Sequence, residues 1–135
     1  MSEPAQLAAV FEGDYQVSRA VATILADRGF AAVSFDERPS DLVATVRSLG
    51  AEVVVLELAM VGVQGLQVVR DLVQAVPGCA VLLLSPIDTL RQPALAAGAF
   101  ALVGSDLRAL DRCLAQLETH RPGQVSISPP GAPKR

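Results

Sequence analysis

Residues Ala51 to Gly65 read AEVVVLELAMVGVQG, and this stretch decides the fold. The segment Val53 to Leu56 is entirely apolar, without the alternation of a strand that has one face in water. Such a run is typical of a central parallel strand that helices cover on both faces. It stops at Glu57, and the sequence then predicts a loop up to Gly65.

Strand and helix patterns alternate on both sides of this strand. Strands are predicted at 7–11, 30–35, 53–56, 80–84 and 100–103. Helices are predicted at 16–28, 39–49 and 65–76, in a short segment around Pro93 that ends at Ala97, and in a last segment with an apolar stripe of Leu107, Leu110, Leu114 and Leu117. The alternation predicts a three-layer α/β/α domain with a parallel sheet and right-handed crossovers.

The composition divides the chain into two parts. Of its 135 residues, 51% are hydrophobic, which is enough for one substantial core. Residues 1–120 are therefore expected to form one domain. The remaining segment, 121–135, is rich in proline and glycine and is predicted to be a disordered tail or a linker.

Charge and cysteine content argue against several classes of function. The formal net charge is -3 and the basic residues are scattered, whereas a nucleic-acid surface needs a clustered basic stripe. Cys79 and Cys113 lie in apolar surroundings and fit reduced core cysteines better than a disulfide framework. No apolar run of about 18 residues indicates a membrane span. We expect a cytoplasmic protein that contacts neither nucleic acid nor membrane.

The loops after the strands are where a site is expected, because parallel α/β sheets carry their working residues at the strands' carboxyl ends. These loops are 12–15, 57–64, 85–88 and 104–106. They contain no paired nucleophile and base, no glycine-rich phosphate loop and no metal-ligand spacing. We expect no enzyme activity, no catalytic residue and no cofactor.

At these loops the chain resembles a response-regulator receiver domain, the phosphoacceptor module of bacterial two-component signalling, from Leu7 to about His120. The residues that carry the resemblance are Phe11-Glu12-Gly13-Asp14 after the first strand, Glu57 with Gly65 eight positions later, Ser85 after the fourth strand, and Ala97-Gly98-Ala99 before the fifth. The resemblance implies a flavodoxin-like receiver fold with strand order 2-1-3-4-5. It also implies a role in a bacterial phosphorelay.

The residues that would carry the family's chemistry differ. In the family, an aspartate at the position of Glu57 accepts the phosphoryl group, and acids after the first strand hold Mg²⁺. Here Glu12 matches the first acid, Gly13 stands at the second, and Asp14 lies one place beyond. The lysine that neutralises the phosphate in the family corresponds to Ser105. The family's switch positions correspond to Ser85 and Leu102.

These differences predict a pocket that is inert toward phosphoryl transfer. Glutamate places its carboxylate one methylene farther out, and in-line transfer tolerates displacement badly. The loss of a carboxylate at Gly13 weakens an octahedral Mg²⁺ site, so Mg²⁺ binding is expected to be weak or absent. Asp14 is expected to cap the first helix, and Ser85 fits turn chemistry better than a switch.

The leading hypothesis is a pseudo-receiver that binds a protein partner without phosphorylation. The partner surface is expected at Arg91, Arg108 and Arg112. A homodimer through the helix around Pro93, strand 100–103 and the last helix is a further expectation. A role of Glu57 as a mimic of the phosphorylated state is less favoured. The groups that would respond to its charge, an aromatic residue at position 102 and a lysine at position 105, are replaced by Leu102 and Ser105.

Two alternatives stay open. An atypical receiver could still be phosphorylated by a histidine kinase, on Asp14 or another nearby acid. A flavodoxin-like small-molecule binder is supported by the fold alone, and a fold by itself assigns no function.

Overall fold

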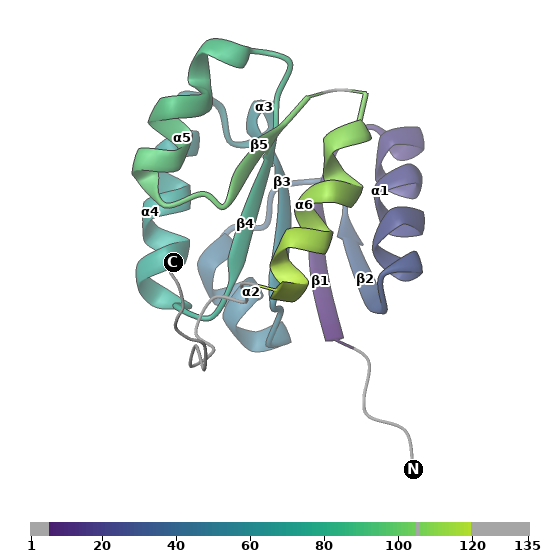
Figure 1. The fold of residues 1–135 in the computed structure, drawn as a ribbon. Coiled ribbons are helices and arrows are strands. Elements are labelled where there is room, and N and C mark those ends of the chain that lie inside the picture. The colour runs from purple at the N-terminus through teal and green to yellow at the C-terminus, as the bar shows by residue number, and fades with distance from the viewer. Residues whose placement is uncertain (1–5, 105, 120–135) are drawn as a thin grey trace.

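A single parallel sheet forms the centre of the molecule, whose computed structural model describes residues 6–104 and 106–119. Its strand order is β2-β1-β3-β4-β5, which confirms the predicted fold class (Figure 1). The strands are β1 (Gln6–Phe11), β2 (Phe30–Phe35), β3 (Val53–Glu57), β4 (Ala80–Leu84) and β5 (Ala101–Val103). The order reverses between β1 and β3, which is where ligands bind in sheets of this kind.

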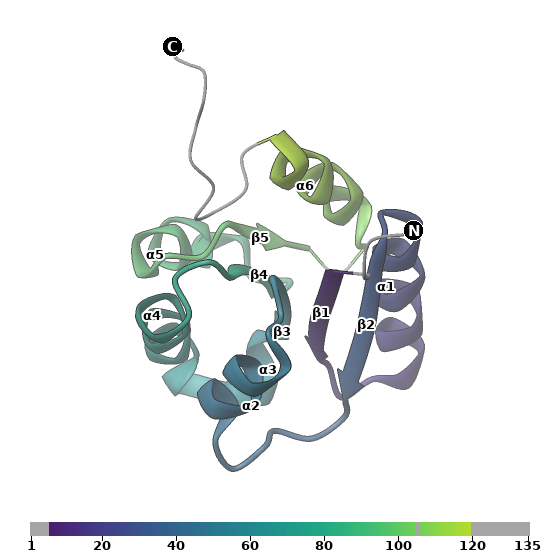
Figure 2. The same ribbon diagram turned by 90° about the horizontal axis from the view of Figure 1, so that it is seen from below.

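Helices form a layer on each side of the sheet. Figures 1 and 2 show α1 and α6 on one face and α2, α4 and α5 on the other. The helical elements are α1 (Tyr15–Asp27), α2 (Leu42–Leu49), α3 (Leu58–Val61), η1 (Gly62–Gln64), α4 (Gly65–Ala75), η2 (Asp88–Leu90), α5 (Arg91–Ala97) and α6 (Arg108–Thr119). Within the described ranges, no helix has the length and apolar character needed to cross a lipid bilayer.

The central strands owe their apolar character to burial on both faces. Successive side chains of a strand point to opposite faces. Accordingly, Leu82 packs with Leu25 and Leu114 in one core cluster, while Leu83 packs with Leu72 in the other. All five leucines are fully buried. The uninterrupted apolar runs in the sequence are thus explained by two cores that share one sheet.

Both cysteines lie in these cores as free thiols, as predicted. Cys79 belongs to the core cluster beneath α2, α4 and α5, and Cys113 belongs to the cluster beneath α1 and α6. Burial raises the pKa of the Cys79 thiol to about 12, so this thiol is protonated and unreactive at neutral pH.

An ion-paired arginine joins two helices that lie far apart in the sequence. The Arg28 guanidinium donates from Nε to Asp111 Oδ1 at 2.9 Å and from Nη2 to Asp111 Oδ2 at 3.1 Å. Its Nη1 donates to Glu118 Oε1 at 3.2 Å. The hydrogen bonds with Arg28 lower the pKa of the Asp111 carboxyl. The end of α1 is thereby linked to one side of α6.

Two local predictions were wrong. The stretch after Glu57 is not an open loop, because α3 and η1 occupy it. The side chain of Leu58, at the start of α3, packs directly against Gly65. Any side chain at position 65 would overlap it, so the glycine permits this short helix. Leu107 lies before α6 rather than in it, with φ 62°. Both segments are too short for a helical period to reveal their conformation.

Candidate functional site

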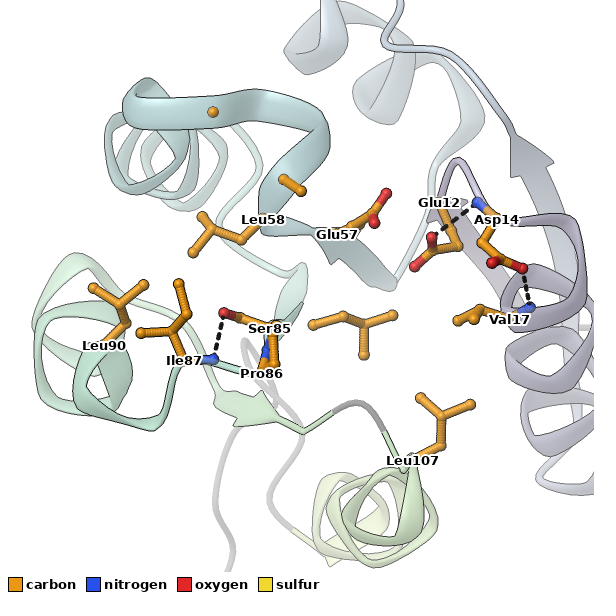
Figure 3. A pocket seen from close by; sticks show the side chains of 13 residues that line it. Glu12, Asp14, Val17, Glu57, Leu58, Ser85, Pro86, Ile87, Leu90 and Leu107 are labelled. Atoms are coloured by element: carbon orange, nitrogen blue, oxygen red, sulfur yellow. Dashed lines mark hydrogen bonds between the residues drawn. The ribbon is translucent and has the colours of Figure 1, made fainter.

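The carboxyl ends of three neighbouring strands bring the predicted site residues together. In the parallel register, Phe11 lies opposite Leu56, and Glu57 lies opposite Leu84. The following positions, Glu12 and Ser85, therefore reach the same edge of the sheet as Glu57. A pocket of about 580 Å³ opens there, and all three residues line it (Figure 3).

The carboxylate of Glu57 accepts a hydrogen bond from a neighbouring turn. The backbone N–H of Gly13 donates to Glu57 Oε1 at 3.0 Å. Gly13 belongs to the turn between β1 and α1, so the contact joins two loops that are 44 positions apart in the chain. The extra methylene of glutamate relative to aspartate extends the carboxylate toward this turn. Glu57 therefore has a structural partner at the position where the family carries its phosphoacceptor.

Glu12 is a buried acid, with only 3% of its surface exposed. Its Oε2 accepts a hydrogen bond from the backbone N–H of Asp14 at 3.0 Å. Burial raises the pKa of the Glu12 carboxyl, and the nearby charge and hydrogen bond of Glu57 raise this pKa further. Asp14 adds a smaller repulsion, and the Asp14 backbone N–H acts in the opposite direction. The Glu12 carboxyl therefore holds its proton more tightly than an isolated carboxyl would.

The Glu12→Gln variant is expected to gain stability relative to the wild type as the pH rises. Because the folded-state pKa of Glu12 is raised above its ordinary value of 4.5, the folded protein holds more protons than the unfolded chain above that pH. Proton binding to Glu12 therefore stabilises the folded wild type at low pH, and this stabilisation is lost as the pH rises through the folded-state pKa. Urea unfolding at pH 4.5 and pH 7 measures the difference. Glu37→Gln, in an exposed turn, is the control, and an equal trend in both variants would contradict the assignment.

Asp14 and Ser85 have local roles that match the predictions. Asp14 Oδ1 accepts from the N–H groups of Gln16 at 2.9 Å and Val17 at 3.1 Å, so it caps α1. Ser85 is buried, and its Oγ accepts from the N–H of Ile87 at 3.1 Å. Each oxygen thus stabilises the backbone that follows its own strand.

The pocket does not fit the Mg²⁺ site that the resemblance implies. A Mg²⁺ ion needs oxygen ligands in near-octahedral positions. Here Glu12, Asp14 and Glu57 each direct a carboxylate oxygen at a backbone N–H group. Among the described residues, no three His, Cys, Asp or Glu side chains are grouped to hold a metal ion. Weak or absent Mg²⁺ binding remains a prediction.

Of the three arginines of the predicted partner surface, Arg91 is exposed and also makes contacts within the fold. The Arg91 Nη1 donates to the Leu102 carbonyl at 2.9 Å, and its Nη2 pairs with Asp88 Oδ1 at 2.7 Å. Arg91 therefore links α5 to β5, while 46% of its side chain stays exposed. Its role in partner binding remains a prediction. Arg108 and Arg112 are exposed one turn apart on α6, as predicted. Leu102 is buried in the core, and Ser105 lies outside the described residues, as does the predicted tail at 121–135.

Two of these arginines lie on the elements that flank β5, since Arg91 is on α5 and Arg112 is on α6. Burial raises the pKa of the Cys113 thiol, and the charges of Arg112 and Arg91 act in the opposite direction. The Arg91 guanidinium reaches β5 at the Leu102 carbonyl, and Arg112 is exposed on α6. Asp111 and Glu118 lie toward α1, where Arg28 holds them.

The apolar wall of the pocket was not predicted from the sequence. Its larger aliphatic side chains come from the end of β4, from the segments that follow β3, β4 and β5, and from the first turn of α1 (Figure 3). They are Val17, Leu58, Leu84, Pro86, Ile87, Leu90 and Leu107. A usable signal was present, since Ile87 and Leu90 are apolar residues in a loop at the carboxyl edge of the sheet.

Comparisons with known proteins locate the fold. No protein-family model and no curated protein matches the sequence. The receiver domain of a DNA-binding response regulator from Colwellia psychrerythraea 34H is similar with a TM-score of 0.72 at 20% identity, over 84% of this chain and 98% of that one.

Two further solved structures share the architecture. A response regulator from Thermotoga maritima has a TM-score of 0.71 at 20% identity, over 85% of this chain and 96% of that one. A putative pilus assembly protein from Burkholderia thailandensis E264 has a TM-score of 0.70 at 21% identity, over 84% of this chain and 98% of that one. The chain has the flavodoxin-like fold of response-regulator receiver domains.

Proposed function

We propose that this chain is a receiver-like domain that acts in bacterial cytoplasmic signalling by binding a protein partner, without phosphorylation. One observation carries the proposal. The carboxylate of Glu57, at the phosphoacceptor position, accepts the Gly13 N–H at 3.0 Å and lies beside the buried acid Glu12. Adding a doubly negative group there would break a structural contact and increase repulsion within the acid pair.

The function rests on this site rather than on the fold. Similar folds include a putative pilus assembly protein as well as response regulators, and a shared fold hosts unrelated functions. At the aromatic switch position, the small aliphatic Leu102 is 2% exposed and packs in the core. This position offers no aromatic ring that could move in response to a new charge. A fixed binding surface is therefore favoured over a phosphate-driven switch.

The proposed surface is the side formed by α5, β5 and α6. Arg108 and Arg112 extend from α6, and Leu95 is 40% exposed on α5, one turn after Arg91. Exposed guanidinium groups on α6 together with an exposed leucine on α5 suit a partner that offers both carboxylates and apolar side chains. A second copy of this chain remains a further candidate for that partner.

A capture experiment with the intact protein tests the proposal. The Arg108→Glu, Arg112→Glu double variant is expected to lose the partners that the wild type binds, since like charges then face the partner's acids. The Arg47→Glu, Arg70→Glu variant, with the same change in net charge on exposed arginines of α2 and α4, is expected to keep them. Partners that survive the first change, or that bind only after acetyl phosphate treatment, would contradict the proposal.

A further inference from the structure

The pocket at the carboxyl edge of the sheet is large enough to hold a small organic molecule. Its volume of about 580 Å³ lies within the range of roughly 300–1,000 Å³ that is usual for ligand pockets. It lies beside the reversal of strand order between β1 and β3, with β4 on its other side. The two carboxylates of Glu12 and Glu57 account for only one part of this space.

One side of the pocket is apolar. Figure 3 shows Leu90 and Ile87 on the side away from Glu12 and Asp14, with Leu58 next to Glu57. Leu107, between β5 and α6, also lines the pocket, and its positive φ is rare for a leucine. Ile87 is 53% exposed although it is aliphatic. An apolar ligand body would cover this surface and release its ordered water.

The other side of the pocket is acidic. Glu12, Asp14 and Glu57 line it, and none of its thirteen described lining residues is a lysine, arginine or histidine. Glu57 is half-buried, and its Oε1 accepts the Gly13 N–H, while each carboxylate oxygen has a second lone pair. An anionic ligand would meet repulsion here. A positively charged hydrogen-bond donor would relieve the repulsion between the two glutamates.

We propose that this pocket binds a small amphiphilic cation, with an aliphatic or aromatic body against Leu58, Ile87 and Leu90 and a primary ammonium or amidinium group at Glu57. The ammonium donates a charge-assisted hydrogen bond to a carboxylate that the protein already holds in place. The body has the size of a few fused or branched hydrocarbon units, which fits the pocket volume. This site is separate from Arg108 and Arg112, neither of which lines the pocket.

Three probes with one hydrocarbon body test the proposal. They are 1-adamantylammonium, 1-adamantanol and 1-adamantanecarboxylate, which differ in charge and share their apolar shape. Titration of the intact ¹⁵N-labelled protein is expected to shift the amides of Glu57, Ser85 and Ile87. The ammonium is expected to bind about tenfold more tightly than the alcohol, the value of one charge-assisted hydrogen bond. The carboxylate is expected to bind most weakly.

Three variants assign the two parts of the ligand. Glu57→Gln keeps an acceptor for the Gly13 N–H, and is expected to reduce ammonium binding to the level of the alcohol while leaving alcohol binding unchanged. Ile87→Ser, at an exposed position, is expected to weaken the binding of the ammonium and of the alcohol by roughly threefold or more through lost apolar contact. Leu95→Ser, on an exposed leucine that does not line the pocket, is the matched control and is expected to change neither affinity.

Two results would overturn the proposal. The first is an absence of amide shifts at the pocket with millimolar 1-adamantylammonium. The second is equal binding of all three probes with no effect of Glu57→Gln. This result would show an apolar pocket that does not distinguish ligands by charge. Neither result would affect the partner surface, because the capture experiment depends on Arg108 and Arg112, which do not line the pocket.

Discussion

The triple variant Glu57→Asp, Gly13→Asp, Ser105→Lys is expected to accept a phosphoryl group from acetyl phosphate in the presence of Mg²⁺. The wild type is expected to remain unlabelled. The change restores the acceptor, the second metal-binding acid and the lysine that the receiver resemblance implies. Because misplacement by about 1 Å can cost a hundredfold in rate, the labelling rate of the triple variant is expected to exceed the wild-type background by about a hundredfold or more. Intact-mass spectrometry measures the gain.

The structure supports two of these changes. In the wild type, Glu57 Oε1 accepts the Gly13 N–H at 3.0 Å. An aspartate at position 57 is one methylene shorter, so its carboxylate withdraws from this N–H. A Cβ at Gly13 would lie 3.6 Å from Glu57 Oε1 and 3.8 Å from the Asp36 carbonyl, both ordinary contact distances. Gly13 also lacks the positive φ that would strain an aspartate. The turn therefore has room for the missing acid.

A matched control separates acceptor chemistry from general changes in charge. Glu57→Asn, placed with the same changes at Gly13 and Ser105, has the shape of the restored acceptor without its nucleophilic oxygen. It is expected to stay unlabelled. If the triple variant also remains unlabelled while still folded, the three substituted positions do not account for the inert pocket.

Leu82→Ala is expected to destabilise the domain by about 2–5 kcal/mol, a large part of the free energy of unfolding typical of such a domain. Leu82 is fully buried on β4, where it packs in the cluster beneath α1 and α6. The substitution removes apolar contact and leaves a cavity that the two packed layers cannot fully close. Equilibrium unfolding in urea, followed by circular dichroism, measures the loss.

The control for this change is another leucine. Leu95→Ala, at a position that is 40% exposed on α5, is expected to change the free energy of unfolding by no more than about 0.5 kcal/mol. Equal losses at Leu82 and Leu95 would contradict the assignment of the core to the two faces of the sheet.

The fold was predictable because its signals are local and repeated. The apolar run Val53 to Leu56 predicts a strand that is covered on both faces. Asp14 predicts a helix cap, which the structure confirms. Contacts between distant segments gave no such signal. The link from Arg28 to Asp111 spans 83 positions and depends on how α1 and α6 pack.

The site was predictable in its position and only partly in its contacts. The rule that strand ends meet at one edge brought Glu12, Glu57 and Ser85 together, as the structure confirms. The hydrogen bond from Gly13 to Glu57 was missed, because it depends on side-chain reach across two loops. The apolar wall was missed because its residues come from four separate elements, each of which contributes only one or a few of them.

The most direct test of the inert pocket is the ¹H–¹⁵N spectrum of the wild-type protein with Mg²⁺ and beryllofluoride, which mimics a phosphoryl group on a carboxylate. Because Gly13 stands at the position of the second metal-binding acid and the Glu57 carboxylate is held at the Gly13 N–H, the spectrum is expected to stay unchanged. Amide shifts clustered around Glu57 and Ser85 would contradict the account.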